Sequence, residues 1–200
     1  MHISEGILSA PVLITGAGLT VTAVGYSLKK MEHKEVPKVA ILSSVFFVAS
    51  LIHVPLGPAS VHLVLNGLTG LLLGWSAFPA ILVALALQGI LFQFGGITTL
   101  GINTLNMALP AIIGFYLFNQ GVRGKNNFIA QILAFLCGFL AVLLSGIMVA
   151  VVLVFTGEAF LQAAKLLLIA HFPVMILEGV LTAFCIGFLK KVKPEILSKG

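Results

Sequence analysis

The first two residues, Met1 and His2, carry three nitrogen atoms that could bind one metal ion together. These are the α-amine of Met1, the amide nitrogen of His2 and the nearer ring nitrogen of His2, which close two fused chelate rings. Square-planar, all-nitrogen coordination suits Ni(II) and Cu(II), is compatible with Co(II) and does not suit Mg(II) or Ca(II). The alternative is a chance histidine in a mobile terminus. The metal interpretation therefore requires a fourth ligand from elsewhere in the chain.

His62 is the first candidate for this fourth ligand, and His53 is the second. His62 follows a stiff Pro-Leu-Gly-Pro turn at 55–58, which we expect to aim the start of a membrane helix inward. His53 precedes that turn and could face outward. For both, the alternative is a histidine that only makes hydrogen bonds at the membrane interface. His33 lies among charged residues and is expected to be an ordinary surface histidine.

Other polar side chains are expected on the same side of the membrane as Met1, where they could orient the ligands or gate the site. Ionisable side chains inside a membrane are costly and are functional candidates by default. A glycine-rich loop at 95–101 could cover an inserted terminus. Glu178 is favoured as an orienting or charge-compensating group rather than a ligand. The complete set is His53, Asn66, Thr98, Thr99, Asn103, Asn106, His171 and Glu178.

The elements that must position these residues are membrane helices. Of the 200 residues, 60% are hydrophobic and 8% are charged, and the mean hydropathy is +1.17, which excludes an ordinary soluble fold. The apolar runs are long enough to cross roughly 30 Å of hydrocarbon as helices and lack the alternation of barrel strands. We predict a single all-α domain over 1–200, with a hairpin at 75–78 and an interfacial turn at 157–165. Its seven transmembrane helices are expected at 7–28, 37–54, 59–75, 77–95, 103–122, 127–156 and 166–190.

The basic residues predict how the chain is oriented. The formal net charge is +5, and the lysines and arginines, with the single exception of Lys165, cluster at 29–38, 123–125 and 190–199. Seven crossings place these clusters on one side, which the positive-inside rule makes cytoplasmic. The N-terminus is then outside and the C-terminus cytoplasmic. No basic segment precedes the first apolar run, so we expect this helix to stay attached. The basic residues flank helices without interleaved aromatic residues, which argues against nucleic-acid binding.

Four segments occur in the order found in a known family and together span nearly the whole chain. They are MHISEG at 1–6, PLGPASVHL at 55–63, FQFGGITTLGINTLNM at 92–107, and HFP at 171–173 followed by Glu178-Gly179. This pattern resembles the CbiM/NikM substrate-binding components of energy-coupling-factor transporters for cobalt and nickel. Phe94 stands where members of the family often have histidine.

The resemblance implies a seven-helix bundle whose N-terminus lies in the substrate pocket. It implies that Met1, His2 and His62 hold Ni²⁺ or Co²⁺ as the transported substrate, in the cytoplasmic membrane of a prokaryote. The implied partners are a transmembrane coupling subunit, cytoplasmic ATPase subunits and often a small accessory membrane protein.

The chain itself is not expected to be an enzyme. It has no Walker A motif, so we expect it not to bind ATP through a P-loop. Two alternatives stay open. One is a substrate-binding component for a vitamin-like molecule, and the other is an intramembrane metallohydrolase, against which the lack of a His-Glu-x-x-His motif counts. The choice between cobalt and nickel also stays open at this point.

Overall fold

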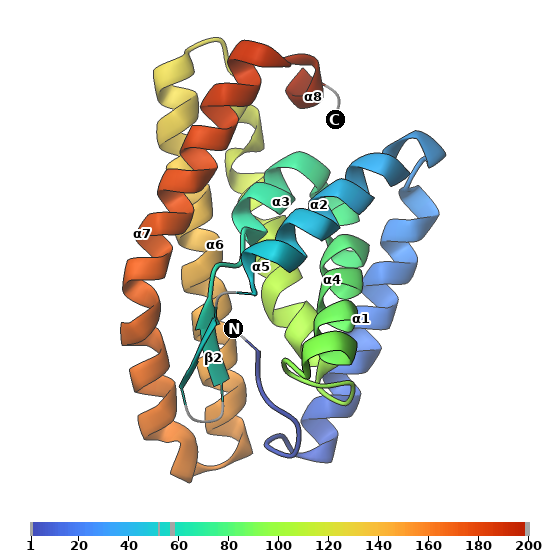
Figure 1. Cartoon of the computed structure of the whole chain (residues 1–200), viewed down its shortest axis with the longest axis vertical. Helices are drawn as coiled ribbons and strands as arrows, with labels where there is room; N and C mark the ends of the chain where they lie inside the picture. Colours follow the sequence, from blue (N-terminus) through green and yellow to red (C-terminus); the bar gives the residue numbers. More distant parts are fainter. Residues whose placement is uncertain (1, 52, 57–58, 199–200) are drawn as a thin grey trace.

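The computed structural model describes residues 2–51, 53–56 and 59–198, which form a helical bundle around a short β-hairpin (Figure 1). The strands β1 (His53–Leu56) and β2 (Ala59–His62) are antiparallel, with His53 opposite His62. Three single turns are η1 (His33–Glu35), η2 (Gly74–Ser76) and η3 (Glu158–Phe160). The helices are α1 (Ala10–Lys30), α2 (Val36–Ala49), α3 (Asn66–Leu73), α4 (Ala77–Phe92), α5 (Leu100–Val122), α6 (Asn127–Thr156), α7 (Leu161–Val192) and α8 (Glu195–Ser198).

Five segments of the described chain are long and apolar enough to cross a membrane as helices. They are Ala10–Lys30, Asn66–Phe92, Leu100–Val122, Asn127–Thr156 and Leu161–Val192. The second of these comprises α3, η2 and α4. Helix α2 has 14 residues, which is shorter than the roughly 20 that one crossing needs. A helical membrane fold is therefore confirmed, while the count of seven crossings and the positions of the termini stay predictions.

The predicted second and third membrane helices are wrong where they meet. The helix predicted at 37–54 ends at Ala49, and the one predicted at 59–75 begins as strand β2 and becomes helical only at Asn66. The fold is therefore not purely α-helical, and His62 lies at the end of a strand instead of near the start of a membrane helix. Pro55 provides a physical reason, because a proline favours extended backbone in the residue before it. The paired strands form hydrogen bonds between their backbone N–H and C=O groups, as a non-helical backbone inside a membrane protein requires.

The last long helix differs from its predicted bounds, whereas α6 occupies the predicted range, 127–156. Helix α7 begins at Leu161 instead of 166, so the turn predicted at 157–165 is reduced to η3. His171 consequently lies inside α7 instead of at its start. Helix α6 begins where the side-chain oxygen of Asn126 accepts hydrogen bonds from the backbone N–H groups of Phe128 (3.0 Å) and Ile129 (3.2 Å), a typical N-cap. The hairpin predicted at 75–78 corresponds to η2.

Basic side chains from distant parts of the sequence gather at the end of the bundle where α1, α5 and α7 finish (Figure 1). Lys38 Nζ donates to the carbonyl oxygens of Leu72 (2.6 Å) and Ile196 (3.5 Å). Lys190 Nζ donates to the carbonyl oxygen of Val122 (3.1 Å). Leu72 and Val122 lie in the last turns of α3 and α5, where a positive charge is favourable. The three basic clusters thus share one end of the molecule.

Helix α3 is seated by very close contacts with its neighbours. At Gly70 a Cβ atom would lie 2.2 Å from the carbonyl oxygen of Ala111 in α5, and at Gly67 it would lie 2.7 Å from the Cα of Gly138 in α6. Small residues allow helices to approach this closely in a membrane. Because α3 follows His62, its seating helps to determine where strand β2 ends.

Replacing Gly70 with alanine should destabilise the protein by about 1–3 kcal/mol, because α3 would have to move away from α5. Thermal unfolding in detergent measures this effect. The matched control is Gly18→Ala, since no atom lies within 4 Å of the Cβ position there. We expect its melting temperature to be unchanged or slightly raised. Equal melting temperatures for the two variants would contradict the packing of α3.

Candidate metal centre

The N-terminal segment, residues 2–9, runs into the bundle and lies beside the hairpin (Figure 1). Ile3 forms an antiparallel bridge with Ala59, and the N–H of Ser60 donates to the carbonyl oxygen of His2 (3.2 Å). The N–H of Ile3 donates to Asn103 Oδ1 (2.9 Å), and Asn103 Nδ2 donates to the carbonyl oxygen of Ile3 (3.1 Å). His2 and Ile3 are buried. This end of the described chain is therefore part of the packed structure.

The glycine-rich loop predicted at 95–101 is found at residues 93–99, because α5 already begins at Leu100, and it holds the N-terminal segment further along the chain. The N–H of Glu5 donates to the carbonyl oxygen of Gly95 (3.0 Å), and Glu5 Oε1 accepts from the N–H of Thr98 (2.9 Å). This hydrogen bond from Thr98 lowers the pKa of the exposed Glu5 carboxyl, which favours the ionised acceptor. At Gly96, φ is +134° and a Cβ atom would lie 1.9 Å from the Glu5 side chain. Glycine is required for this close approach.

The rings of His2 and His62 stack inside the protein, with centroids 4.5 Å apart and planes inclined by 30°. Each residue is only 3% exposed. His62 Nδ1 lies 2.7 Å from the carbonyl oxygen of Leu63. Because a carbonyl oxygen can only accept, Nδ1 carries the proton and Nε2 is the unprotonated nitrogen. Burial disfavours a charged imidazole, which favours this neutral form.

His2 has the opposite tautomer because of Gln88. His2 Nε2 lies 2.7 Å from Gln88 Oε1, so Nε2 carries the proton and Nδ1 is unprotonated. Gln88 is oriented in turn, since its amide nitrogen donates to Ser50 Oγ and to the carbonyl oxygen of Phe47 (3.5 Å). Nδ1 is the ring nitrogen nearer to the backbone. It is therefore the nitrogen that a chelate formed with the N-terminal backbone would use.

Glu178 fixes the backbone that follows His62. Its carboxylate accepts hydrogen bonds from the N–H groups of Val64 and Leu65, with Leu65 N at 2.8 Å from Oε1 and 2.9 Å from Oε2. Leu65 has φ +51°, a left-handed conformation that is uncommon for residues other than glycine. The N–H donors also compensate for burial of the carboxylate. Glu178 thus positions His62 through the main chain.

Two predicted site residues fall partly or wholly outside the described part of the structure. Met1 lies outside the described residues. The backbone of His53 pairs with that of His62 across the hairpin, and the side chain of His53 lies outside the described part.

The predicted loop residues are placed at the N-terminal segment: the amide N–H of Thr98 donates to Glu5, and Thr99 Oγ1 accepts from Asn103 Nδ2 (3.1 Å).

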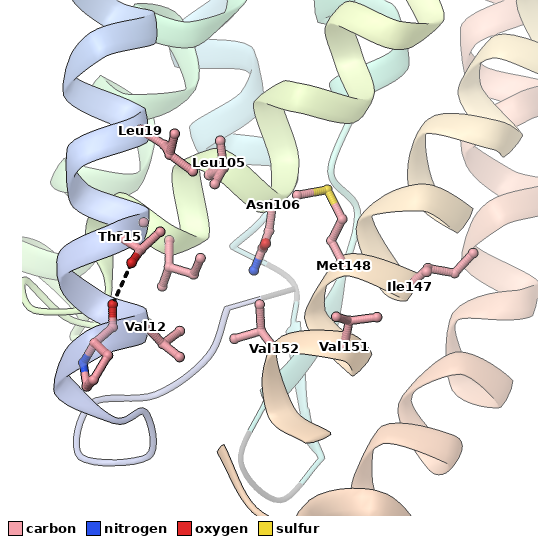
Figure 2. A pocket seen from close by; sticks show the side chains of 12 residues that line it. Val12, Thr15, Leu19, Leu105, Asn106, Ile147, Met148, Val151 and Val152 are labelled. Carbon is pink, nitrogen blue, oxygen red and sulfur yellow. Dashed lines mark hydrogen bonds between the residues drawn. The ribbon is translucent and has the colours of Figure 1, made fainter. Parts of the chain in front are cut away.

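Three further predicted residues lie in other surroundings. Asn66 is part of the core, where its Nδ2 donates to the carbonyl oxygen of Met107 (3.1 Å) and to Ser145 Oγ (2.9 Å). The buried His171 ring donates from Nδ1 to the carbonyl oxygen one turn earlier in α7 (2.7 Å). Asn106 points into a groove between α1 and α6 (Figure 2). Asn66 therefore belongs to the interior of the bundle, whereas Asn106 belongs to this groove.

Gln88 and Glu5 are not among the predicted site residues, although the sequence holds a signal for each. Gln88 is a polar amide within an otherwise apolar predicted span, which is costly unless it has a partner. Glu5 lies in the MHISEG segment, but the loop that it holds is more than eighty residues away. Phe94 stands where members of the resembling family often have histidine. Its ring centroid lies 6.4 Å from that of His2.

These features define a class: a membrane protein with several crossing helices, whose inserted N-terminal segment places one buried histidine against another. Comparison with known proteins identifies the family. A sequence profile described as "Cobalt uptake substrate-specific transmembrane region" (CbiM) matches residues 2–196. The chain belongs to this CbiM family and is a multi-pass protein of a prokaryotic cell membrane.

Similar proteins agree with this assignment over the full chain. A protein of Haemophilus influenzae, named as a candidate metal transport protein, is 41% identical over 201 residues, covering 100% of this chain and 98% of the relative. The fused nickel transport protein NikMN of Rhodobacter capsulatus is 29% identical over 222 residues, covering 99% of this chain and 64% of the relative. A crystal structure described as a transition metal transporter superposes with a TM-score of 0.79 at 26% identity, covering 96% of this chain and 93% of the other.

Replacing Asn103 with leucine should release the N-terminal segment, because both backbone groups of Ile3 lose their partner. Hydrogen–deuterium exchange should then be faster at residues 2–5 while the exchange of α5 is maintained. Asn119→Leu, near the other end of α5, is the control and should leave residues 2–5 as protected as in the wild type. Unchanged protection in Asn103→Leu would show that this side chain does not hold the segment.

Proposed function

We propose that this chain binds Ni²⁺ or Co²⁺ and passes the ion inward as the substrate-binding membrane component of an ATP-driven importer of the energy-coupling-factor type. The observation that carries the proposal is the pair of buried, stacked rings in which His2 Nδ1 and His62 Nε2 are the unprotonated nitrogens. Relatives named as nickel and cobalt transport proteins support these two ions.

The donor atoms favour the same ions. Imidazole nitrogens suit nickel and cobalt, whereas magnesium and calcium prefer oxygen ligands. Among the described residues, no group of three or more His, Cys, Asp or Glu side chains lies together as a metal site. We propose that backbone nitrogens complete the ligand set, namely the amide nitrogen of His2 and the α-amine of Met1. With the two rings, these make four nitrogen donors.

The surrounding hydrogen bonds support the proposal by arranging the rings before an ion arrives. Gln88 and the carbonyl group of Leu63 each hold a ring proton on the nitrogen that does not serve as the ligand. Neither ring then has to lose a proton when the ion binds. Asn103 and Ala59 fix the backbone of Ile3, next to His2. Such outer groups orient ligands and strengthen metal binding.

The proposed direction of transport follows from the basic end of the bundle. We propose seven crossings, with this end in the cytoplasm as the positive-inside rule requires and the N-terminus outside. The hairpin and the N-terminal segment lie away from the basic end (Figure 1), which suits capture from outside. Energy would come from a transmembrane coupling subunit and cytoplasmic ATPase subunits. The NikMN relative, of which this chain covers 64%, supports a further component beside this one.

Removing either ring should weaken Ni²⁺ binding by more than about 100-fold, because a ligand is lost rather than merely misoriented. The measurement is calorimetric titration of the purified chain, comparing His2→Ala and His62→Ala with the control His33→Ala. His33 lies in the exposed turn η1, so its removal should leave the affinity unchanged. A residue added before Met1 converts the α-amine to an amide and should cause a similar loss. Full affinity in the extended protein or in His2→Ala would refute the proposed ligand set.

Replacing Gln88 with leucine should weaken Ni²⁺ binding by about 10- to 100-fold, the range typical of outer groups that orient a metal ligand. The physical reason is that the His2 ring loses the acceptor that holds its proton on Nε2. The same titration measures this effect, with the exposed Gln120→Leu in α5 as the control. Equal affinities for the two variants would show that Gln88 does not orient His2 for binding.

A further inference from the structure

A groove runs along α5 between α1 and α6 and encloses about 420 Å³ (Figure 2). Helix α5 packs against both of its neighbours and forms the floor of the groove. Val12 and Leu19 of α1 form one wall, and Ile147, Val151 and Val152 of α6 form the other. The walls are therefore apolar, as expected for a surface within a membrane.

Asn106 stands on the floor of this groove and its side chain points into it (Figure 2). It is fully buried, and among the described residues neither its amide nitrogen nor its amide oxygen has a hydrogen-bond partner. Nearby polar groups are already engaged, since Asn103 holds Ile3 and the Thr15 hydroxyl donates to the carbonyl oxygen of Pro11 (2.8 Å). Hydrocarbon offers an amide no hydrogen bond. Asn106 therefore offers an N–H donor and a carbonyl acceptor to an occupant of the groove.

Helix α1 presents small residues beside the groove. Gly16 is used within the bundle, because a Cβ atom there would lie 2.7 Å from the Ile102 side chain. At Gly18 and Gly25, in contrast, no atom lies within 4 Å of the Cβ position. Gly18 is one turn from Thr15, which lines the groove. Open glycines of this kind allow the backbone of another membrane helix to approach closely.

We propose that the groove binds a transmembrane helix of a partner membrane protein, which places an amide or hydroxyl side chain against Asn106. An acyl chain fits the walls but cannot form the hydrogen bonds. Lipid headgroups lie near helix ends, whereas Asn106 lies about 9 Å along α5 from Leu100, at 1.5 Å per residue. A second copy that docks through its α1 is a poorer occupant, because the hydroxyls of Thr15 and Thr22 already donate to carbonyl oxygens of their own helix.

The identity of the partner rests on the proposed function: we assign the helix to a component equivalent to the part of NikMN that extends beyond the region matched by this chain. The probe is that part of the Rhodobacter capsulatus protein, produced separately and reconstituted with the full chain in lipid vesicles. Energy transfer between labels on the two proteins measures their association. We expect saturable association with the wild-type chain, and its absence would overturn the proposal.

Val151→Trp fills the groove and should weaken this association at least tenfold. The matched control is Val180→Trp in α7, a valine of similar exposure (52% against 46%) that does not line the groove, and it should have no effect. Equal association for both variants would overturn the proposal. Energy transfer between two labelled copies of this chain that Val151→Trp abolishes would assign the groove to self-association and would also overturn it.

Asn106→Leu provides a test in which two measurements should move in opposite directions. In the isolated chain, removal of an unsatisfied buried amide should raise the melting temperature by about 2–4 °C. In the vesicles, the same change should weaken association by about 3- to 30-fold, as for polar contacts between membrane helices. A lower melting temperature with unchanged association would overturn the proposal. Ni²⁺ titration of Val151→Trp, which leaves the histidines intact, tests the proposed function separately from the groove.

Discussion

An extended backbone inside a membrane protein has to find hydrogen bonds, and this constraint governs the centre of the molecule. Neither lipid nor a helix supplies partners to residues 2–5, so other parts of the chain must. The hairpin offers the edge of β2 to His2 and Ile3, Asn103 offers a side-chain amide, and the glycine-rich loop offers Gly95. The N-terminal segment is therefore held by three elements that lie far from it in the sequence.

The same need for hydrogen-bond partners applies to the two buried histidine rings. Each ring gives one nitrogen to a structural hydrogen bond and leaves the other unprotonated, and the acceptors differ: an amide side chain for His2 and a neighbouring carbonyl group for His62. The tautomers are opposite because Gln88 faces Nε2 of His2, whereas the carbonyl group of Leu63 faces Nδ1 of His62. Glu178 extends the arrangement to α7, because its carboxylate supports the left-handed turn at Leu65, which leads from the hairpin into α3. Displacement of α7 would therefore be transmitted to His62 through the backbone of Val64 and Leu65.

Helix α5 connects the interior to the surface that faces lipid or a partner. Asn103 and Asn106 are one turn apart, yet Asn103 is saturated by the N-terminal segment while Asn106 is left facing the groove. Both residues have the same chemistry and a similar sequence context. Their roles differ because α5 presents Asn103 toward the hairpin and Asn106 toward the space between α1 and α6.

By itself, the sequence determined the membrane class, the long apolar helices, the gathering of basic residues at one end and the candidate histidines, because hydropathy, charge and residue type are local properties. It placed a helix at 59–65, where apolar residues are as compatible with a buried strand as with a helix. Only the tertiary structure decided that His62 ends a strand, that Gln88 faces His2 and that Glu178 acts through the backbone of Leu65. The physical reason is that a hydrogen bond between residues 86 or 113 positions apart depends on how the helices pack, and no local pattern encodes that geometry.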